Sequence, residues 1–143
     1  MNHAAVKEGV HRYFHREYEV TGAKNFCKEC DAPEWHGRPD IVFVQSRRDV
    51  IHVVEAKRLA GEVDGGLDQL RRYPGNYRWL ALPADEYYSA GYGIASSCHE
   101  QGVGLLLLSG EARYNTEVKR WPAYREGDFL HHYPKANQAW KGR

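Results

Sequence analysis

Three charged side chains stand at the ends of two predicted β-strands, where they could act together. Residues 40–45 and 50–57 are rich in β-branched and apolar side chains, and a short polar stretch joins them. A turn centred on the middle of that stretch pairs positions whose numbers sum to 95, which sets Asp40 opposite Glu55. Because side chains alternate along a strand, Lys57 follows Glu55 on the same face, roughly 6–7 Å further along.

Two carboxylates placed opposite each other in a hairpin repel, because their Cβ atoms are only roughly 4.5–5.5 Å apart. A divalent cation would remove that penalty, and buried charges are tolerated mainly when they are paired or metal-bound. The spacing therefore indicates a site for a divalent cation with an ammonium group beside it. A turn of three or five residues would shift the pairing by one position and weaken the facing arrangement.

Three short motifs occur in the order and spacing of the PD-(D/E)XK nuclease superfamily and of its RecB-like branch. They are the Gly-x-x-Asp of residues 37–40, the Glu-x-Lys of residues 55–57 and the Gln-x-x-x-Tyr of residues 69–73. Each motif alone is common, and their order and spacing together carry the resemblance. The chain therefore resembles this superfamily over residues 37–73.

The resemblance implies a metal-dependent nuclease that hydrolyses phosphodiester bonds, with DNA as the expected substrate. The metal would be Mg²⁺ or Mn²⁺, which prefer oxygen ligands, held by Asp40, Glu55 and the main-chain carbonyl of Ala56. Lys57 would orient the attacking water or stabilise the charged transition state. These residue types fit the reaction because negative charge builds up on an already negative substrate, and cations stabilise it.

A helix is predicted over residues 3–17, where apolar side chains recur at helical spacing. In the resembling nucleases an N-terminal helix often lends a glutamate to the metal site. Glu8 is the first candidate for this role, as a ligand of a second metal or of a metal-bound water, and Glu17 is its rival. Alternatively, Glu8 is an ordinary solvated glutamate.

A second helix is predicted over residues 67–73, stopped by the Pro-Gly pair that follows. Gln69 and Tyr73 are four residues apart and would share one face. In the resemblance, Gln69 holds the substrate or Lys57, and Tyr73 contacts the phosphate backbone. Otherwise Tyr73 is an aromatic at the edge of the core and the neighbouring arginines are solvated. The candidate contacts to nucleic acid are Arg38, Arg58, Arg71 and Arg72.

Cys27 and Cys30 have the spacing of half a zinc site, and a structural Zn²⁺ is the alternative to a loop that merely holds two thiols. His36, Cys98 and His99 are the candidates to complete it. Some RecB-like relatives carry an iron-sulfur cluster on four cysteines, whereas this chain has three.

The remaining pattern predicts an α/β fold. Strands are expected over residues 17–24, 77–83 and 102–108, and the last two form a parallel pair because the helical stretch 85–101 connects them. We expect a restriction-endonuclease-like αβββαβ core with a mixed central sheet of about five strands, flanked by helices.

Residues 1–110 are expected to form the nuclease core of the 143-residue chain. Residues 111–143 are expected to add a β-hairpin and a basic, aromatic tail that stacks on bases or packs on the core. The formal charge of +1 gives no global basic field, and no apolar run approaches the ~18 residues of a membrane span. We expect a cytoplasmic monomer or homodimer.

Several alternatives stay open from the sequence. The expected substrate is DNA that is single-stranded, branched or has duplex ends, and RNA is an alternative. Both structure-specific and end-processing cleavage fit the sequence, and either would suit DNA repair. A non-catalytic nucleic-acid module and a zinc-stapled interaction protein on the same fold are the competing functions. A thiol-redox role for Cys27 and Cys30 is the weakest, because they do not precede a helix that would stabilise a thiolate.

Overall fold

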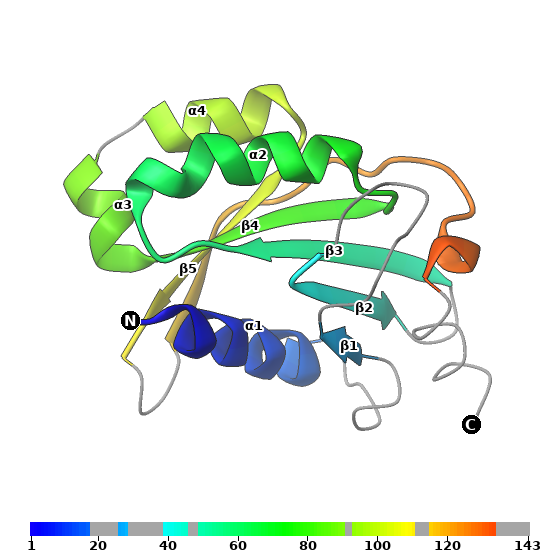
Figure 1. The fold of residues 1–143 in the computed structure, drawn as a ribbon, viewed down its shortest axis with the longest axis horizontal. Coiled ribbons are helices and arrows are strands. Elements are labelled where there is room, and N and C mark those ends of the chain that lie inside the picture. Colours follow the sequence, from blue (N-terminus) through cyan, green and yellow to red (C-terminus); the bar gives the residue numbers. More distant parts are fainter. Residues whose placement is uncertain (18–25, 29–38, 46–48, 91–92, 111–114, 134–143) are drawn as a thin grey trace.

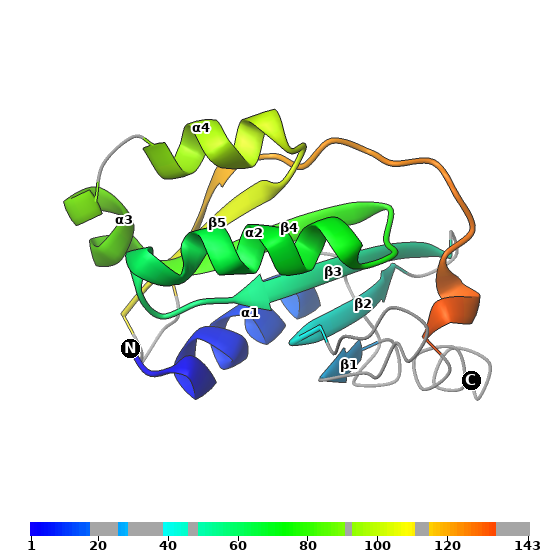
Figure 2. The same ribbon diagram turned by 45° about the horizontal axis from the view of Figure 1, so that its top comes forward.

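A mixed six-stranded sheet forms the centre of the computed structural model, and helices cover both of its faces (Figure 1, Figure 2). The structure describes residues 1–17, 26–28, 39–45, 49–90, 93–110 and 115–133. The α/β fold predicted from the sequence is confirmed.

The strands lie in the sheet in the order in which they follow one another along the chain. The middle pairs β3–β4 and β4–β5 are parallel, and the outer pairs are antiparallel. The strands are β1 (Phe26–Lys28), β2 (Ile41–Gln45), β3 (Val50–Ala56), β4 (Tyr77–Pro83), β5 (Gly104–Ser109) and β6 (Asn115–Arg120). The expectation of about five strands is exceeded by β6, which adds an antiparallel edge to the sheet.

Helix α1 lies on one face of the sheet, and the other three α-helices lie on the opposite face (Figure 2). The helices are α1 (His3–Glu17), α2 (Val63–Arg72), α3 (Ala84–Ala90) and α4 (Gly93–Glu100), with short 3-10 turns at Ala60–Glu62 and Leu130–His132. The order α1-β1-β2-β3-α2-β4 is that of the predicted αβββαβ core. The predicted helix over 85–101 is divided into α3 and α4.

The register of the β2–β3 hairpin is the predicted one. Ile41 pairs with Val54 and Gln45 pairs with Val50, so that each pair of numbers sums to 95. Asp49, just before β3, has a φ of 53°, a left-handed conformation that Asp adopts more readily than most residues. The hairpin therefore brings Asp40 and Glu55 to the same end of the sheet.

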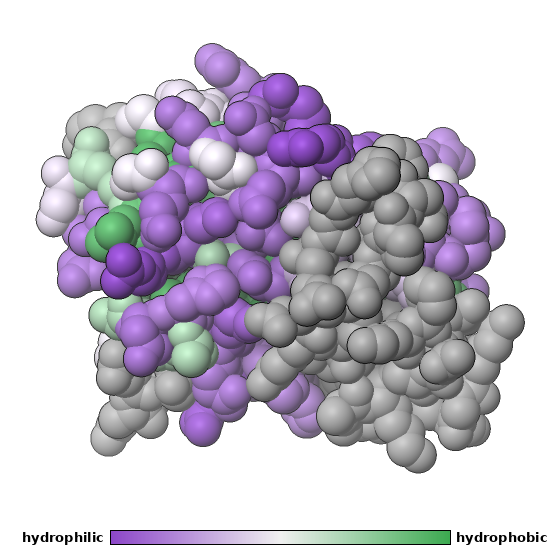
Figure 3. Space-filling view, viewed as in Figure 1, coloured by the Kyte–Doolittle hydropathy of each residue, from purple (hydrophilic) through white to green (hydrophobic). Residues whose placement is uncertain are grey.

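Alternating side chains of the strands build two apolar layers. Val42 and Val53 face α2 and α4, whereas Phe43 and Trp79 face α1 and pack against Phe14. All five of these side chains are fully buried. The described surface on the side seen in Figure 1 is mostly hydrophilic (Figure 3). No helix among the described residues is long and apolar enough to cross a membrane.

The boundaries of two predicted elements differ from the observed ones. Glu17 ends α1 and does not begin a strand, while residues 18–24 of that predicted strand lie outside the described residues. Helix α2 begins at Val63, four residues before the predicted start, and ends at Arg72, one residue before the predicted end. Of the predicted C-terminal unit, β6 extends the sheet and residues 121–133 pack back on the body.

Candidate active site

Asp40 and Glu55 are tied to each other through the backbone just beyond the last residue pair of the hairpin. The main-chain N–H of Ala56 donates to Asp40 Oδ2 at 2.8 Å, and the N–H of Asp40 donates to Glu55 Oε1 at 3.2 Å. Each carboxylate therefore has a fixed position set by the opposite strand. Because Glu55 is only 2% exposed, water does little to screen its charge.

The surroundings of Glu55 favour its neutral form. Burial, and after it the neighbouring Asp40, raises the pKa of Glu55 to about 8. The ammonium of Lys57, with Nζ 3.7 Å from Glu55 Oε2, acts in the opposite direction without compensating. A carboxyl group in such surroundings holds a proton at neutral pH unless a cation replaces it.

Lys57 is positioned by two neighbouring elements. Its main-chain N–H donates to the carbonyl of Ala81 at 2.9 Å, which continues the parallel pairing with β4. Its Nζ donates to Gln69 Oε1 at 2.8 Å, so α2 holds the end of the side chain. This is one of the two contacts expected for Gln69.

Helix α2 comes close to Lys57 because Gly66 has no side chain. A Cβ at this position would lie 2.9 Å from Leu80 Cδ1 and 3.0 Å from Lys57 Cε. Such distances are shorter than van der Waals contact, so a larger residue would push the helix or the lysine away. Gly66 therefore serves the close packing of α2 on the sheet.

His3 is a site residue that the sequence analysis missed. Its Nε2 lies 3.3 Å from Asp40 Oδ2 and 3.0 Å from the main-chain oxygen of Ala56. These are two of the three oxygens predicted to hold a metal. The only sequence signal is a polar residue in the first turn of the helix, and it becomes informative once the direction of α1 across the sheet is known.

Glu8 does not take the place predicted for it. It lies five residues after His3 in α1, which is about 7.5 Å further along the axis and turned by about 140°. There its Oε1 accepts a hydrogen bond from Arg12 Nε at 3.3 Å. The helix does contribute to the site, but through its first turn. A role for Glu8 as a ligand stays a prediction that this geometry does not support.

Tyr73 is buried and belongs to the apolar layer under α2, so the prediction that it shares a helical face with Gln69 is wrong. It follows the last residue of α2 in an extended conformation, with φ −83° and ψ 131°. The alternative, an aromatic at the edge of the core, describes it better, because its side chain is only 4% exposed.

The arginines near the end of α2 lie on the surface. Arg71 and Arg72 are exposed, and Arg71 pairs with Asp68 at 3.3 Å. Burial, and then the positive charges of Arg125 and Arg71, lower the pKa of Arg78. These guanidinium groups therefore form a basic cluster beside α2. Arg58 is also exposed, directly after Lys57, and Arg38 lies outside the described residues.

The zinc prediction cannot be followed at Cys27 and Cys30, since the side chain of Cys27 and all of Cys30 and His36 lie outside the described residues. Cys98 is fully buried in the apolar layer, and burial raises the pKa of its thiol to about 12. Zinc binds the thiolate, so Cys98 does not fit as a further ligand. The neighbouring His99 contacts Arg120 at 3.4 Å.

The residues at this site fit a hard divalent cation. They offer two carboxylates and a main-chain oxygen, the donors that Mg²⁺ and Mn²⁺ prefer. The raised pKa of Glu55 agrees with this choice of ligands, because a bound cation would lower that pKa again. No three His, Cys, Asp or Glu side chains in the described part of the chain are arranged to hold a metal by themselves. Water and the main-chain oxygen would complete the coordination.

The fold and this site define an α/β protein whose mixed sheet carries a pair of carboxylates and a lysine at one end. No protein-family model matches the chain, and no curated protein matches it in sequence. Among solved structures it is similar to the SPO1766 protein of unknown function from Silicibacter pomeroyi, with a TM-score of 0.62 and 16% identity. That match covers 99% of this chain and 92% of the other. At this identity the likeness extends to the fold alone.

Proposed function

We propose that this protein is a metal-dependent nuclease of the PD-(D/E)XK type that hydrolyses phosphodiester bonds in DNA. The observation that carries the proposal is the meeting of Asp40, Glu55 and Lys57 at one end of the sheet, with Gln69 hydrogen-bonded to the lysine. Two carboxylates that converge in this way repel each other when both are ionised, and a bound cation would remove that repulsion. The same cation would suit a phosphodiester substrate.

Each residue has a role that follows from its contacts. Asp40, Glu55 and the carbonyl of Ala56 would hold Mg²⁺ or Mn²⁺, which when bound lowers the pKa of a coordinated water and neutralises charge on the phosphate. Lys57 would donate a hydrogen bond to the attacking water or to a phosphate oxygen. Gln69 keeps Nζ of Lys57 in place, and the imidazole of His3 would contribute to the same group of ligands.

The basic cluster beside α2 supports nucleic acid as the substrate. Arg71 and Arg72 extend from the same helix that carries Gln69, three residues or fewer further along the chain. Phosphate groups are bound mainly by Arg and Lys, and such contacts fix the register of a strand without reading its sequence. A strand cleaved at the carboxylates could thus be held along α2.

The test is cleavage of labelled single-stranded, duplex, flapped and four-way-junction DNA, and of RNA, with Mg²⁺, Mn²⁺ or EDTA. We expect metal-dependent cutting that falls by at least about a hundredfold in Glu55→Gln and in Lys57→Ala, because each change removes a group that acts on the transition state. Glu100→Gln, an exposed carboxylate at the end of α4, is the matched control and should cleave like the wild type.

Two further variants separate the ligands offered by α1. His3→Ala should reduce cleavage, whereas Glu8→Gln should leave it close to the wild-type rate, since His3 contacts Asp40 and Ala56, and Glu8 pairs with Arg12 further along the helix. Wild-type cleavage by Glu55→Gln would contradict the proposal. Binding of DNA without any cutting under all conditions would favour a non-catalytic nucleic-acid module.

A further inference from the structure

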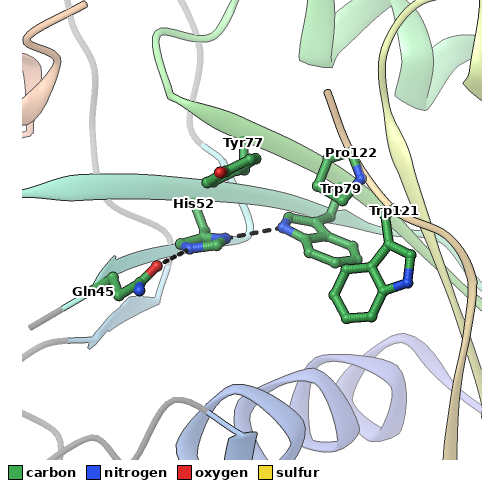
Figure 4. Close-up of a pocket in the computed structure, with 6 residues that line it drawn as sticks. All are labelled: Gln45, His52, Tyr77, Trp79, Trp121 and Pro122. Carbon is green, nitrogen blue, oxygen red and sulfur yellow. Dashed lines mark hydrogen bonds between the residues drawn. The ribbon is translucent and has the colours of Figure 1, made fainter. Parts of the chain in front are cut away.

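A cavity lies on the α1 side of the sheet, away from the end that carries Asp40 and Glu55. It has a volume of about 300 Å³ and is lined by Gln45, His52, Tyr77, Trp79, Trp121 and Pro122 (Figure 4). His52 precedes Glu55 by three residues, about 10 Å along β3, and its side chain points to the α1 side. The cavity is therefore separate from the candidate active site.

Stacked aromatic rings form most of its wall. The ring of His52 is nearly parallel to those of Tyr77 and Trp79, at interplanar angles of 26° and 25°. Trp121 meets Trp79 edge to face at a centroid distance of 5.9 Å, yet 68% of Trp121 is exposed. Tyr124, against Tyr77, is 56% exposed. Large rings that stay exposed beside a cavity mark a surface on which another flat group can stack.

A chain of hydrogen bonds fixes the orientation of one polar group of the cavity, the side-chain amide of Gln45. Trp79 Nε1 can only donate, so His52 Nδ1 accepts its hydrogen at 3.0 Å. Burial lowers the pKa of His52 to about 3, so the ring is neutral and its single hydrogen is on Nε2. This hydrogen goes to Gln45 Oε1 at 3.0 Å (Figure 4).

The orientation of the Gln45 amide follows from that chain. Because its oxygen faces His52, its NH₂ group is left as a donor at the wall of the cavity. No described residue accepts a hydrogen bond from it. The cavity thus presents flat apolar faces, no formal charge among its lining residues and one oriented pair of N–H donors.

We propose that this cavity binds unpaired bases of single-stranded nucleic acid, which stack on Trp121 and accept a hydrogen bond from the amide of Gln45. Every base has a flat face and a carbonyl oxygen or ring nitrogen that accepts, so the bases of one strand match both features. An aliphatic or proline side chain of a peptide would use only the apolar faces. The lack of charge also disfavours a phosphate in the cavity itself.

This inference shares its nucleic-acid ligand with the proposed function, but it does not depend on hydrolysis. The cavity lies about 10 Å along β3 from Glu55, and His52 and Glu55 point to opposite sides of that strand, so a base held here would secure a strand away from the point of cleavage. Binding can therefore be measured in EDTA with the Glu55→Gln variant. Failure of binding and failure of cleavage would then be distinguished.

The experiment compares the affinity of a fluorescein-labelled oligo(dT) with that of an abasic strand of the same length. Stacking on an aromatic ring predicts that Trp121→Ala weakens oligo(dT) binding roughly 5- to 100-fold. Gln45→Leu, which keeps the shape and removes the donor, should weaken it several-fold. Tyr88→Ala is the matched control, since Tyr88 is 58% exposed on α3 and far from this cavity in the chain.

The abasic strand should bind weakly and to the same degree in all variants. Thymidine tests the base without the strand. At millimolar concentration it should shift the indole N–H signal of Trp121 in NMR spectra. Circular dichroism would confirm that each variant is folded. Equal affinity of Trp121→Ala and Tyr88→Ala, abasic binding as tight as that of oligo(dT), or no binding by the wild type would each overturn the proposal.

Discussion

Two buried titratable side chains on β3 have pKa values shifted in opposite directions. Burial and the nearby Asp40 raise the pKa of Glu55 from 4.5 to about 8, and burial lowers the pKa of His52 from 6.5 to about 3. Both shifts favour the neutral side chain at pH 7. The neutral ring of His52 is the form that makes both hydrogen bonds, because Nδ1 must accept from Trp79 while Nε2 donates to Gln45. For Glu55 neutrality is the state of the metal-free site, and the proposed cation would replace the proton.

These shifts predict how stability depends on pH in metal-free buffer. The stability that Glu55 contributes is complete below pH 4.5 and is lost as the pH rises through about 8, because the folded state holds the proton more tightly. His52 acts in the opposite direction, since its contribution is present above pH 6.5 and is lost as the pH falls through about 3. Of these two contributions to stability, only that of Glu55 changes between pH 6.5 and 8.

We therefore expect the free energy of unfolding in EDTA to fall by about 1–2 kcal/mol between pH 6.5 and 8 through Glu55 alone. Urea titrations of the wild type and of Glu55→Gln at several pH values would measure it. The variant should lack this part of the decrease, and millimolar Mg²⁺ should diminish it in the wild type. Parallel pH curves for the two proteins would contradict the assignment.

The elements differ in how well local sequence specifies them. The β2–β3 hairpin was predicted with its register because β-branched residues alternate on both sides of a short turn, and a slip by one residue would turn its apolar side chains outward. The bounds of α1 and β4 also agree with the prediction. In each of these elements the side chains that the apolar pattern predicts to be buried are the ones that pack in the core.

Features set by distant contacts could not be predicted in this way. Tyr73 is buried because residues 121–133 return to this end of the sheet, where Arg125 donates to its carbonyl at 2.6 Å. The contact of His3 depends on the direction in which α1 crosses the sheet. Gly66 lies outside the predicted helix, which began at residue 67, because its packing partners are distant in the chain: Leu80 on β4 and Lys57 after β3.

Helix α2 provides a matched pair of glycines with which to test its close approach. Gly66→Ala should lower the free energy of unfolding by about 1–2 kcal/mol, because the added methyl group meets Leu80 Cδ1 at 2.9 Å. Gly65→Ala should raise it by roughly 0.5–1 kcal/mol, since a Cβ there has no neighbour within 4 Å and alanine favours the helix.

Urea unfolding at fixed pH gives both values. Because the methyl group on Gly66 would also approach Lys57 Cε at 3.0 Å, Gly66→Ala should reduce any cleavage more than Gly65→Ala does. Stabilisation by both substitutions would show that α2 lies further from the sheet than described here.

At the scale of the whole molecule, the C-terminal segment of residues 121–133 joins the far edge of the sheet to the start of β3 and β4 (Figure 1). It leaves β6, passes Gly102, whose carbonyl accepts from the N–H of Ala123, and reaches Asn76. It also supplies Trp121 and Pro122 to the aromatic cavity. The chain thus uses one segment to close the fold and to complete a binding surface.

Asn76 is the residue on which this closure depends. It is 2% exposed, and its side-chain amide accepts from Ile51 N–H at 2.8 Å and donates to the carbonyls of Arg125 and Gly127 at 3.0 Å each. Its main chain bonds to Ile51 and Arg125 as well. One buried amide therefore links β3 to the C-terminal segment with all of its hydrogen-bonding groups satisfied.

We expect Asn76→Ala to lower the free energy of unfolding by about 2–4 kcal/mol, because it leaves a buried N–H and two carbonyl groups without their partner. Asn115→Ala, at an exposed position of β6, is the control and should change stability by less than about 0.5 kcal/mol. Urea unfolding compares them, and hydrogen exchange at Ala123 and Arg125 reports on the segment itself. If the segment only rests on the surface, these amides will exchange equally in both variants; if Asn76 holds it, they will lose protection in Asn76→Ala alone.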